Sequence, residues 1–186
     1  MRIFTKMKKE LFIEIEIPEG IEASMDENEI TVKGPEGELK KTFSLGKLQA
    51  EIKEGKIVIG NKKSTKTEKK MMNTIAAHVR NMIKGVKEEF KYEMKICFHH
   101  FPITVEVQGD KAVIKNFLGE KTPREVSIPD GAEVKVEKDI LKISAMDRDL
   151  AGQAAANFEK ATKIRMRDRR VFQDGIFITN KAGKEM

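Results

Sequence analysis

The sequence is poor in the residues that staple or anchor small proteins. It has one cysteine (Cys97), no tryptophan and one tyrosine among 186 residues. A single cysteine excludes an internal disulfide, which fits a reducing compartment such as the cytoplasm. No run of about 18 apolar residues occurs, so we expect no membrane partner. The segment ELFIEIEI (10–17) alternates apolar residues with glutamate, which predicts a strand and not the continuous apolar core of a signal peptide.

The motifs of common enzymes are also missing. GxxxxGK[ST] does not occur, and no GxGxxG follows an apolar strand pattern. Cys97, His99 and His100 are close in sequence, but a strand places Cys97 and His99 on one face and His100 on the other, so three metal ligands cannot converge from this segment alone. The carboxylates are interleaved with lysine and lack an apolar setting that would shift their pKa. We therefore expect no catalytic residue, no metal, no cofactor and no small-molecule substrate.

Positive charge, in contrast, is abundant. The chain carries 36 Lys and Arg against 30 Asp and Glu, a formal net charge of +6 and a pI near 9.2. A basic balance of this size favours a polyanionic partner, although lysine-rich surfaces also serve solubility. The placement of the cations within the fold has to decide between the two.

The chain contains an internal repeat. ITVKGPEGE (30–38) and AVIKNFLGE (112–120) each combine a short apolar strand, a lysine and a turn closing on Gly-Glu, 82 positions apart. IKEGKIVI (52–59) and VKVEKDILKI (134–143) each predict a hairpin around a tight polar turn.

A helix follows the hairpin in both copies. The first is predicted over 65–84, with Gly85 as a left-handed cap, and the second over about 150–164, with Asp147 or Asp149 as its N-cap. A strand pattern follows each helix, over 92–98 in the first copy and 176–179 in the second.

The repeat predicts an α+β fold made of two tandem copies of a small domain, each an antiparallel sheet with one helix. We expect a first domain at 1–92, a second at 93–180 and a short tail at 181–186. HHFP (99–102) is the expected joint between the copies.

The basic residues form two clusters. Lysines lie between 62 and 70, around the start of the first helix. The other cluster runs from Lys160 through Arg170, at the end of the second helix and just past it, and is mostly arginine; most of it lies in KIRMRDRRVF (163–172). Arginine offers a planar fork that bonds phosphate through two nitrogens, so the second cluster is the better candidate for nucleic acid. If that segment runs extended, its alternate cations face one way and Ile164 and Met166 anchor the other face. The alternative is a solvated helix end, where cations also favour the dipole.

NFLGEK (116–121) places two large apolar residues in a predicted turn. Phe117 and Leu118 either pack beneath the neighbouring copy or meet a partner surface. An aromatic ring among cations is also a common way to meet RNA. We keep the turn as a candidate partner contact, comprising Asn116, Phe117, Leu118 and Gly119.

Four blocks of the sequence resemble large-subunit ribosomal protein six (the L-six family), in its archaeal and eukaryotic form, whose eukaryotic counterpart is numbered nine. They are HVRNMIKGV (78–86), HFPITV (100–105), NFLGEK (116–121) and DGIFI (174–178), in the family's order and spacing. The resemblance covers nearly the whole chain and implies a structural protein of the large ribosomal subunit, located in the cytoplasm with the ribosome.

The resemblance also implies partners and contact residues. Members of the family consist of two tandem α+β domains and bind the large ribosomal RNA mainly through the second domain, near the sarcin–ricin loop and the translation-factor site. Large-subunit rRNA and neighbouring ribosomal proteins are therefore the expected partners. The residues expected to bind RNA here are Lys115, Lys121, Arg124, Lys163, Arg165, Arg167, Arg169, Arg170, Lys181 and Lys184.

Two other functions remain as alternatives. The chain could be an adaptor that binds a protein through Phe117 and Leu118 and uses charge only for solubility. A nuclease or other hydrolase would need a carboxylate or histidine cluster that the sequence does not show. Salt separates the first from RNA binding, because phosphate contacts weaken steeply as salt rises. We expect the lysines of 62–70 to contribute less to RNA binding than the arginine cluster.

Overall fold

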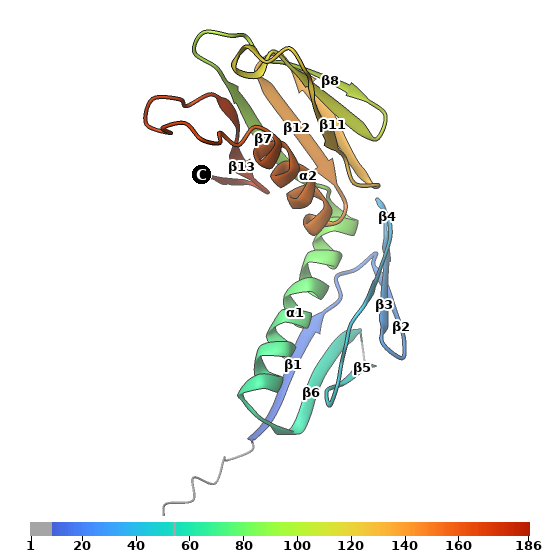
Figure 1. Ribbon diagram of the computed structural model, residues 1–186. Coiled ribbons are helices and arrows are strands. Elements are labelled where there is room, and N and C mark those ends of the chain that lie inside the picture. The colour runs from blue at the N-terminus through green and yellow to red at the C-terminus, as the bar shows by residue number, and fades with distance from the viewer. Residues whose placement is uncertain (1–8, 54) are drawn as a thin grey trace, which may run out of the picture. The chain divides into compact units, whose positions relative to one another are not determined.

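The computed structural model describes residues 9–53 and 55–186, which form two compact units that divide between Glu88 and Glu89 (Figure 1). The first contains β1 (Lys9–Glu16), β2 (Glu22–Asp26), β3 (Glu29–Gly34), β4 (Gly37–Thr42), β5 (Gln49–Lys53), β6 (Lys56–Ser64) and α1 (Lys66–Lys87). The second contains β7 (Phe90–Cys97), β8 (Thr104–Gln108), β9 (Lys111–Lys115), the 3₁₀ turn η1 (Phe117–Gly119), β10 (Arg124–Ser127), β11 (Ala132–Glu137), β12 (Ile140–Ala145), α2 (Arg148–Ala161), β13 (Gly175–Lys181) and β14 (Lys184–Glu185).

Each unit combines a three-stranded meander, a second sheet and one helix; the second sheet has three strands in the first unit and five in the second. The sheets of the first unit run β1-β6-β5 and β2-β3-β4, and those of the second run β11-β12-β7-β13-β14 and β10-β9-β8. All paired strands are antiparallel. Each helix packs its apolar face on the core of its own unit. The predicted α+β class in two tandem copies is confirmed, and within the described residues no helix is long and apolar enough to cross a membrane.

The two units correspond element by element up to the helix. Strand β1 pairs with β6 as β7 pairs with β12, so both units open with the strand beside their hairpin. The interpretation of the strand near 92–98 as the end of the first copy is therefore wrong. Sequence order alone could not show this, because the pairing partners of a strand are set by the sheet and not by the preceding helix.

The remaining boundaries shift accordingly. The sequence placed the domain division at 92/93, whereas β7 belongs wholly to the sheet of the second unit. His99 to Pro102 lie between β7 and β8, within the second unit, and not at the joint. Residues 181–186, predicted as a tail, include the end of β13 and the short strand β14 that pairs with it.

Helix α1 continues past the residue predicted to end it. Gly85 is buried inside α1 and does not adopt the left-handed conformation of a cap. The next residue, Val86, is fully buried and lies so close to Gly34 that a Cβ at that glycine would overlap the valine Cγ1. Packing against β3 therefore extends the helix to Lys87. The low helix propensity of glycine, taken alone, favoured an end at Gly85.

The edge of β13 is closed by side chains from the end of α2. The hydroxyl of Thr162 accepts from the backbone N–H of Ile176 at 3.0 Å and donates to the carbonyl of Phe158 at 3.1 Å. A carboxylate oxygen of Glu159 accepts from the N–H of Ile178 at 3.2 Å. These bonds satisfy edge amides that another chain could otherwise pair with, and they fix the point where the chain leaves α2.

Thr162→Val tests this closure, because it keeps the shape of a buried side chain and removes the hydroxyl from both bonds. We expect the free energy of unfolding to fall by about 1–3 kcal/mol, since the buried N–H of Ile176 loses its acceptor. Urea unfolding monitored by circular dichroism measures the change. The matched control is Thr179→Val, whose exposed hydroxyl donates only to the Glu93 carbonyl. Equal stability of the two variants would contradict the account.

Candidate nucleic-acid interface

The segment from Lys163 to Asp174, here called the arginine loop, connects α2 to β13 (Figure 1). Thr162 fixes its beginning through the bonds described above. Its other end is fixed by Asp174, a buried carboxylate that accepts from the backbone N–H of His99 at 3.1 Å. The loop therefore leaves from and returns to fixed points of the second unit.

A turn stabilised by its own residues forms the middle of the arginine loop. The backbone N–H groups of Val171 and Phe172 donate to the carbonyl of Asp168 at 3.1 and 3.0 Å. The Asp168 carboxylate accepts from the guanidinium of Arg170 at 2.9 Å and from its backbone N–H at 2.9 Å. These bonds, the side-chain one first, lower the pKa of Asp168 below its ordinary value. The Arg167 guanidinium stacks on the Phe172 ring, 4.9 Å from its centre.

The extended row of cations predicted for this segment is wrong. Residues 163–174 contain bends and a turn but no strand, and Met166 has a left-handed φ of 56°. Met166 is fully exposed, so it anchors nothing, while Ile164 does pack against the core. The local Asp168–Arg170 bonds favour a turn over an extended chain, because an aspartate readily bonds the backbone two residues on.

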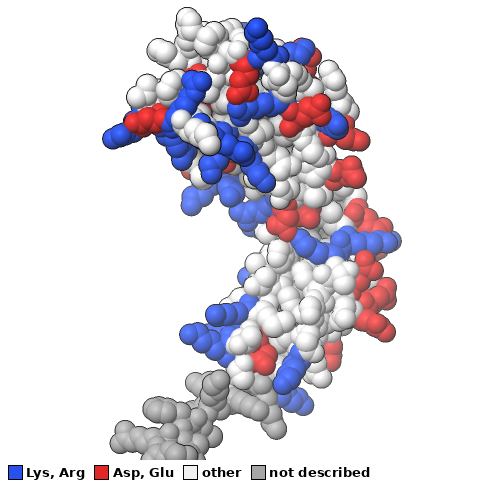
Figure 2. Space-filling view, in the orientation of Figure 1, with Lys and Arg blue, Asp and Glu red and all other residues white. Residues whose placement is uncertain are grey.

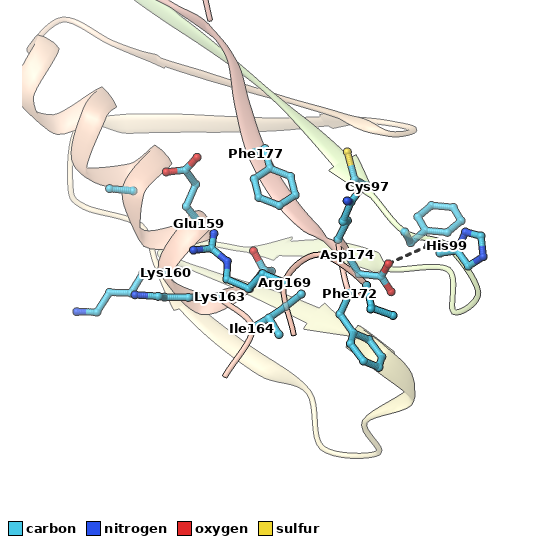
Figure 3. Close-up of a pocket in the computed structure, with 15 residues that line it drawn as sticks. Cys97, His99, Glu159, Lys160, Lys163, Ile164, Arg169, Phe172, Asp174 and Phe177 are labelled. Atoms are coloured by element: carbon cyan, nitrogen blue, oxygen red, sulfur yellow. Dashed lines mark hydrogen bonds between the residues drawn. The ribbon is translucent and has the colours of Figure 1, made fainter. Parts of the chain in front are cut away.

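An open hollow of about 1110 Å³, the loop groove, lies beside the arginine loop (Figure 3). The end of α2 forms one side, the arginine loop another, and the ends of β7 and β13 the rest. The Arg169 side chain reaches toward the end of α2, where Glu159, Lys160 and Lys163 lie (Figure 3). The groove thus gathers side chains from segments far apart in the sequence.

In the loop groove the acidic side chains are hydrogen-bonded, whereas the basic ones are not paired. Both of its acids are engaged with backbone amides, Glu159 with that of Ile178 and Asp174 with that of His99. The three cations of the groove form no ion pair with any described residue. They are Lys160, Lys163 and Arg169. The groove therefore presents free positive charge, and on the face seen in Figure 2 Lys and Arg gather around the arginine loop.

Aromatic rings line the same groove. Phe98 and Phe177 are each 42% exposed, an uncommon exposure for phenylalanine. Phe177 stands on β13 close to Gly175, where a Cβ would meet its ring at 2.9 Å. Sequence reasoning missed both rings as site residues, although Phe177 lies within the quoted block DGIFI. It placed Lys160 in the basic cluster but not among the residues expected to bind RNA. Exposed rings beside unpaired cations suit a ligand with flat apolar faces and negative charge.

A family model described as Ribosomal protein L6 matches residues 17–89 and 101–175. The chain belongs to this family. The two matches begin after β1 and after β7 and end just beyond α1 and at the start of β13, so the family match follows the internal repeat.

Curated relatives agree with the family match. The chain is 43% identical to large ribosomal subunit protein uL6 of Methanosarcina mazei over 95% of the chain and 100% of the relative. It is 46% identical to that of Methanobrevibacter smithii, over 90% of the chain and 94% of the relative. It is 39% identical to that of Methanothrix thermoacetophila, over 94% and 99%. The predicted resemblance to the archaeal form is confirmed.

Membership settles the general class of the protein. It is a structural component of the large ribosomal subunit and not an enzyme, and its place is the cytoplasm, where archaeal ribosomes are found. Within the described part of the chain, no three potential metal ligands come together. Asp174, the one buried acid near Cys97 and His99, bonds the His99 backbone and not its ring.

Arg124, predicted to bind RNA, is engaged inside the second unit. Its guanidinium donates to both carboxylate oxygens of Glu120, at 2.8 and 2.6 Å, and to the carbonyl of Ala161 at 2.5 Å. It also stacks on the Phe117 ring, 4.2 Å from the ring centre. The Ala161 bond satisfies a carbonyl at the end of α2, so Arg124 helps to position the arginine loop.

The other predicted cations differ in their surroundings. Lys115 pairs with Glu106 at 2.7 Å, and Arg170 pairs with Asp168. Lys121, Arg165, Lys181 and Lys184 are exposed and form no ion pair within the described residues, Lys181 and Lys184 facing each other across β13 and β14. Of the cations predicted to bind RNA, only Lys163 and Arg169 line the loop groove. Arg165, Arg167 and Arg170 belong to the arginine loop but are not among the residues lining the groove.

The apolar turn at 116–119 is not an exposed apolar surface. Phe117 is 1% exposed and lies in the core of the second unit, and Leu118 is half-buried against it. Asn116 and Leu118 have left-handed φ angles of 60° and 52°, and Asn116 donates to the carbonyl of Pro102 at 3.1 Å. Phe117 thus fills its own unit, neither stacking on a base nor anchoring a partner.

Arg124→Gln is expected to lower the stability of the second unit by about 1–2 kcal/mol, through loss of the Ala161 bond and the ring contact. Urea unfolding provides the measurement. Lys115→Gln is the control, because an exposed ion pair contributes at most about 1 kcal/mol. Unchanged stability of Arg124→Gln together with strongly weakened RNA binding would instead make Arg124 a direct contact.

The Arg124–Glu120 pair also predicts a pH dependence. Hydrogen bonds from Arg124, and then its charge, lower the pKa of Glu120 from its ordinary 4.5. The stabilisation is therefore complete above pH 4.5 and is lost as the pH falls through the lower folded pKa. We expect the stability difference between wild type and Arg124→Gln to stay constant from neutral pH down to about pH 4.5 and to shrink as the pH falls further. A difference that grows on acidification would contradict this assignment.

Proposed function

We propose that the protein is held in the large ribosomal subunit by binding large-subunit rRNA through the loop groove. The observation that carries the proposal is the cluster of Lys160, Lys163 and Arg169, which no described carboxylate neutralises while the two nearby acids accept from backbone amides. A polyanion would be attracted to this face and would displace its counterions.

The arginine loop supplies the phosphate contacts in this proposal. Arg165 and Arg169 offer unpaired guanidinium forks that can bond phosphate through two nitrogens. Arg167 stacks on Phe172 and forms no ion pair with a described residue, while Arg170 would have to exchange Asp168 for phosphate. Lys121, Lys181 and Lys184 do not line the groove and would add weaker contacts elsewhere on the second unit. Arg124 and Lys115 contribute less because they are engaged internally.

The exposed rings narrow the kind of RNA expected. Phe98 and Phe177 offer flat faces on which an unstacked base can lie, and bases of a regular helix are not accessible in that way. A bulge, loop or sharp bend, with one base turned out of the stack, would satisfy both the rings and the cations. As the family resemblance implies, we propose that this RNA lies near the sarcin–ricin loop and the translation-factor site. Neighbouring ribosomal proteins are further partners in the same proposal.

The adaptor function lacks the feature that suggested it. It required Phe117 and Leu118 to be exposed, and Phe117 is buried in the core. We therefore propose RNA binding as the function and not that of a protein adaptor built on this turn.

The test is a salt series of binding between the purified protein and large-subunit rRNA. The variant Lys163→Gln/Arg165→Gln/Arg169→Gln should reduce the slope of log affinity against log salt by about 2 to 3, because each substituted cation leaves one RNA phosphate with its counterion. The matched control, Lys111→Gln/Lys135→Gln/Lys142→Gln, removes three cations that pair with Glu125, Glu133 and Glu137 on the same unit.

The control separates specific contacts from net charge, because both variants lose three charges. A slope that changes equally in the two variants would mean that the protein attracts RNA only through its overall charge, and would reject the loop groove as the binding site. Circular dichroism confirms that both variants remain folded.

A further inference from the structure

The outer face of α1 carries a stripe of cations that the loop groove does not include. The helix has 22 residues and is therefore about 33 Å long. Six of its residues are exposed Lys or Arg, and only one is acidic. The six, here called the α1 stripe, are Lys66, Lys69, Lys70, Arg80, Lys84 and Lys87.

The helical phase concentrates these cations. At 100° per residue, all six fall within an arc of about 100°, with Asn73 and Ala77 between them. Glu68 lies about 150° from the centre of this arc. In Figure 2 Lys and Arg accordingly line the side of the first unit formed by α1.

No described residue neutralises the α1 stripe. Its six side chains form no ion pair with any residue of 9–53 and 55–186. Glu68 is engaged in the capping box of the helix, where it accepts from the backbone N–H of Thr65 at 2.7 Å and from the Thr65 hydroxyl. Elsewhere in the unit, surface cations form ion pairs with acidic side chains, as Lys40 does with Glu38.

The arrangement destabilises the isolated helix. Lys66 with Lys70 and Arg80 with Lys84 are like charges four residues apart, which repel on a helix surface. The cations of the first turns also oppose the helix dipole. Nothing in the fold of the first unit requires them, because the core uses the opposite face of α1.

We infer that the α1 stripe is a second RNA-binding surface, which takes the phosphate backbones of a double-helical segment. The cations form one group near each end of α1, separated by the small or uncharged Asn73 and Ala77. Such a helix can lie across the wide, shallow minor groove of an RNA duplex, with each group on one backbone and the uncharged middle near the 2′-hydroxyls.

The chemistry of the stripe favours RNA over a protein partner. Interfaces between proteins centre on buried apolar anchors, and Ala77 is the only apolar residue on this arc. The cations span the whole helix, which suits an extended and uniformly charged ligand. The proposal enlarges the role expected for the lysines near 62–70, because the charge continues through Arg80 to Lys87.

The test uses the full chain and a blunt RNA duplex longer than α1, without loops or bulges. Two variants neutralise the ends of the stripe, Lys66→Gln/Lys69→Gln/Lys70→Gln and Arg80→Gln/Lys84→Gln/Lys87→Gln. The control is Lys33→Gln/Lys40→Gln/Lys56→Gln, whose lysines pair with Glu38, Glu14 and Glu16. Each stripe variant should bind the duplex at least about tenfold more weakly at 0.1 M salt, with a slope shallower by about 2 to 3, while the control stays close to wild type.

Two further readouts keep the result interpretable. Acetylation footprinting of the complex should protect Lys66, Lys69, Lys70, Lys84 and Lys87 and leave Lys33 and Lys40 reactive. Without RNA, the first stripe variant should raise the unfolding temperature by a few degrees, because it removes repulsion, so weaker binding cannot be attributed to misfolding.

The possible outcomes are distinct. Equal binding by the stripe variants and the control, or no protection, would overturn the inference and leave a merely solvated face. Binding of a polyglutamate peptide in preference to the duplex would also overturn it, in favour of an acidic protein. The arginine-loop variant is measured alongside. If it loses affinity for large-subunit rRNA while the stripe variants bind as wild type does, the proposed function stands and the inference fails. If the stripe variants lose affinity while the arginine-loop variant binds as wild type does, the inference stands and the proposed function fails.

Discussion

The end of α2 is the point on which the second unit depends. Thr162, Glu159 and Arg124 meet there, and between them they satisfy the last carbonyls of the helix and two edge amides of β13. Because these bonds hold helix, sheet edge and meander together, the arginine loop starts from a fixed position. The fold therefore offsets the repulsion between like charges that are held in one loop. The loop groove is thus preformed before a ligand binds.

The two units share a plan but differ at one edge, and this difference accounts for their surfaces. In the second unit β13 pairs with β7, and the segment leading to it becomes the arginine loop. In the first unit β1 pairs with β6 alone among the described strands, and no loop of that kind follows α1. Positive charge appears there on the helix itself. A duplicated fold can in this way present two cationic surfaces of different geometry, a groove with aromatic rings and a straight stripe, each suited to a different form of RNA.

Much of the fold could be predicted from the sequence, because its signals are local. These local signals are the alternation in β1, the hairpin turns, an N-cap at Asp147 or Asp149 and the apolar stripe of α2, each of which depends on near neighbours. The predictions that were wrong depended on contacts between residues distant in the sequence. The packing of Val86 against Gly34 extends α1, and pairing with β12 assigns β7 to the second unit. At the site, composition indicated the arginine cluster. The sequence could not show that Phe117 is buried, that Arg124 bonds within the unit, or that the Phe177 ring lines the groove, because these depend on the three-dimensional arrangement.

The most direct test of RNA binding at the loop groove is photo-crosslinking of large-subunit rRNA to the protein, with the attached peptides identified by mass spectrometry. Aromatic side chains in contact with unstacked bases are well placed to crosslink, so the account predicts attachment at Phe98 or Phe177 and at the arginine loop. These crosslinks should disappear in Lys163→Gln/Arg165→Gln/Arg169→Gln and persist in the Lys111→Gln/Lys135→Gln/Lys142→Gln control. Crosslinks confined to other segments, with the groove peptides unmodified in wild type, would contradict the central claim.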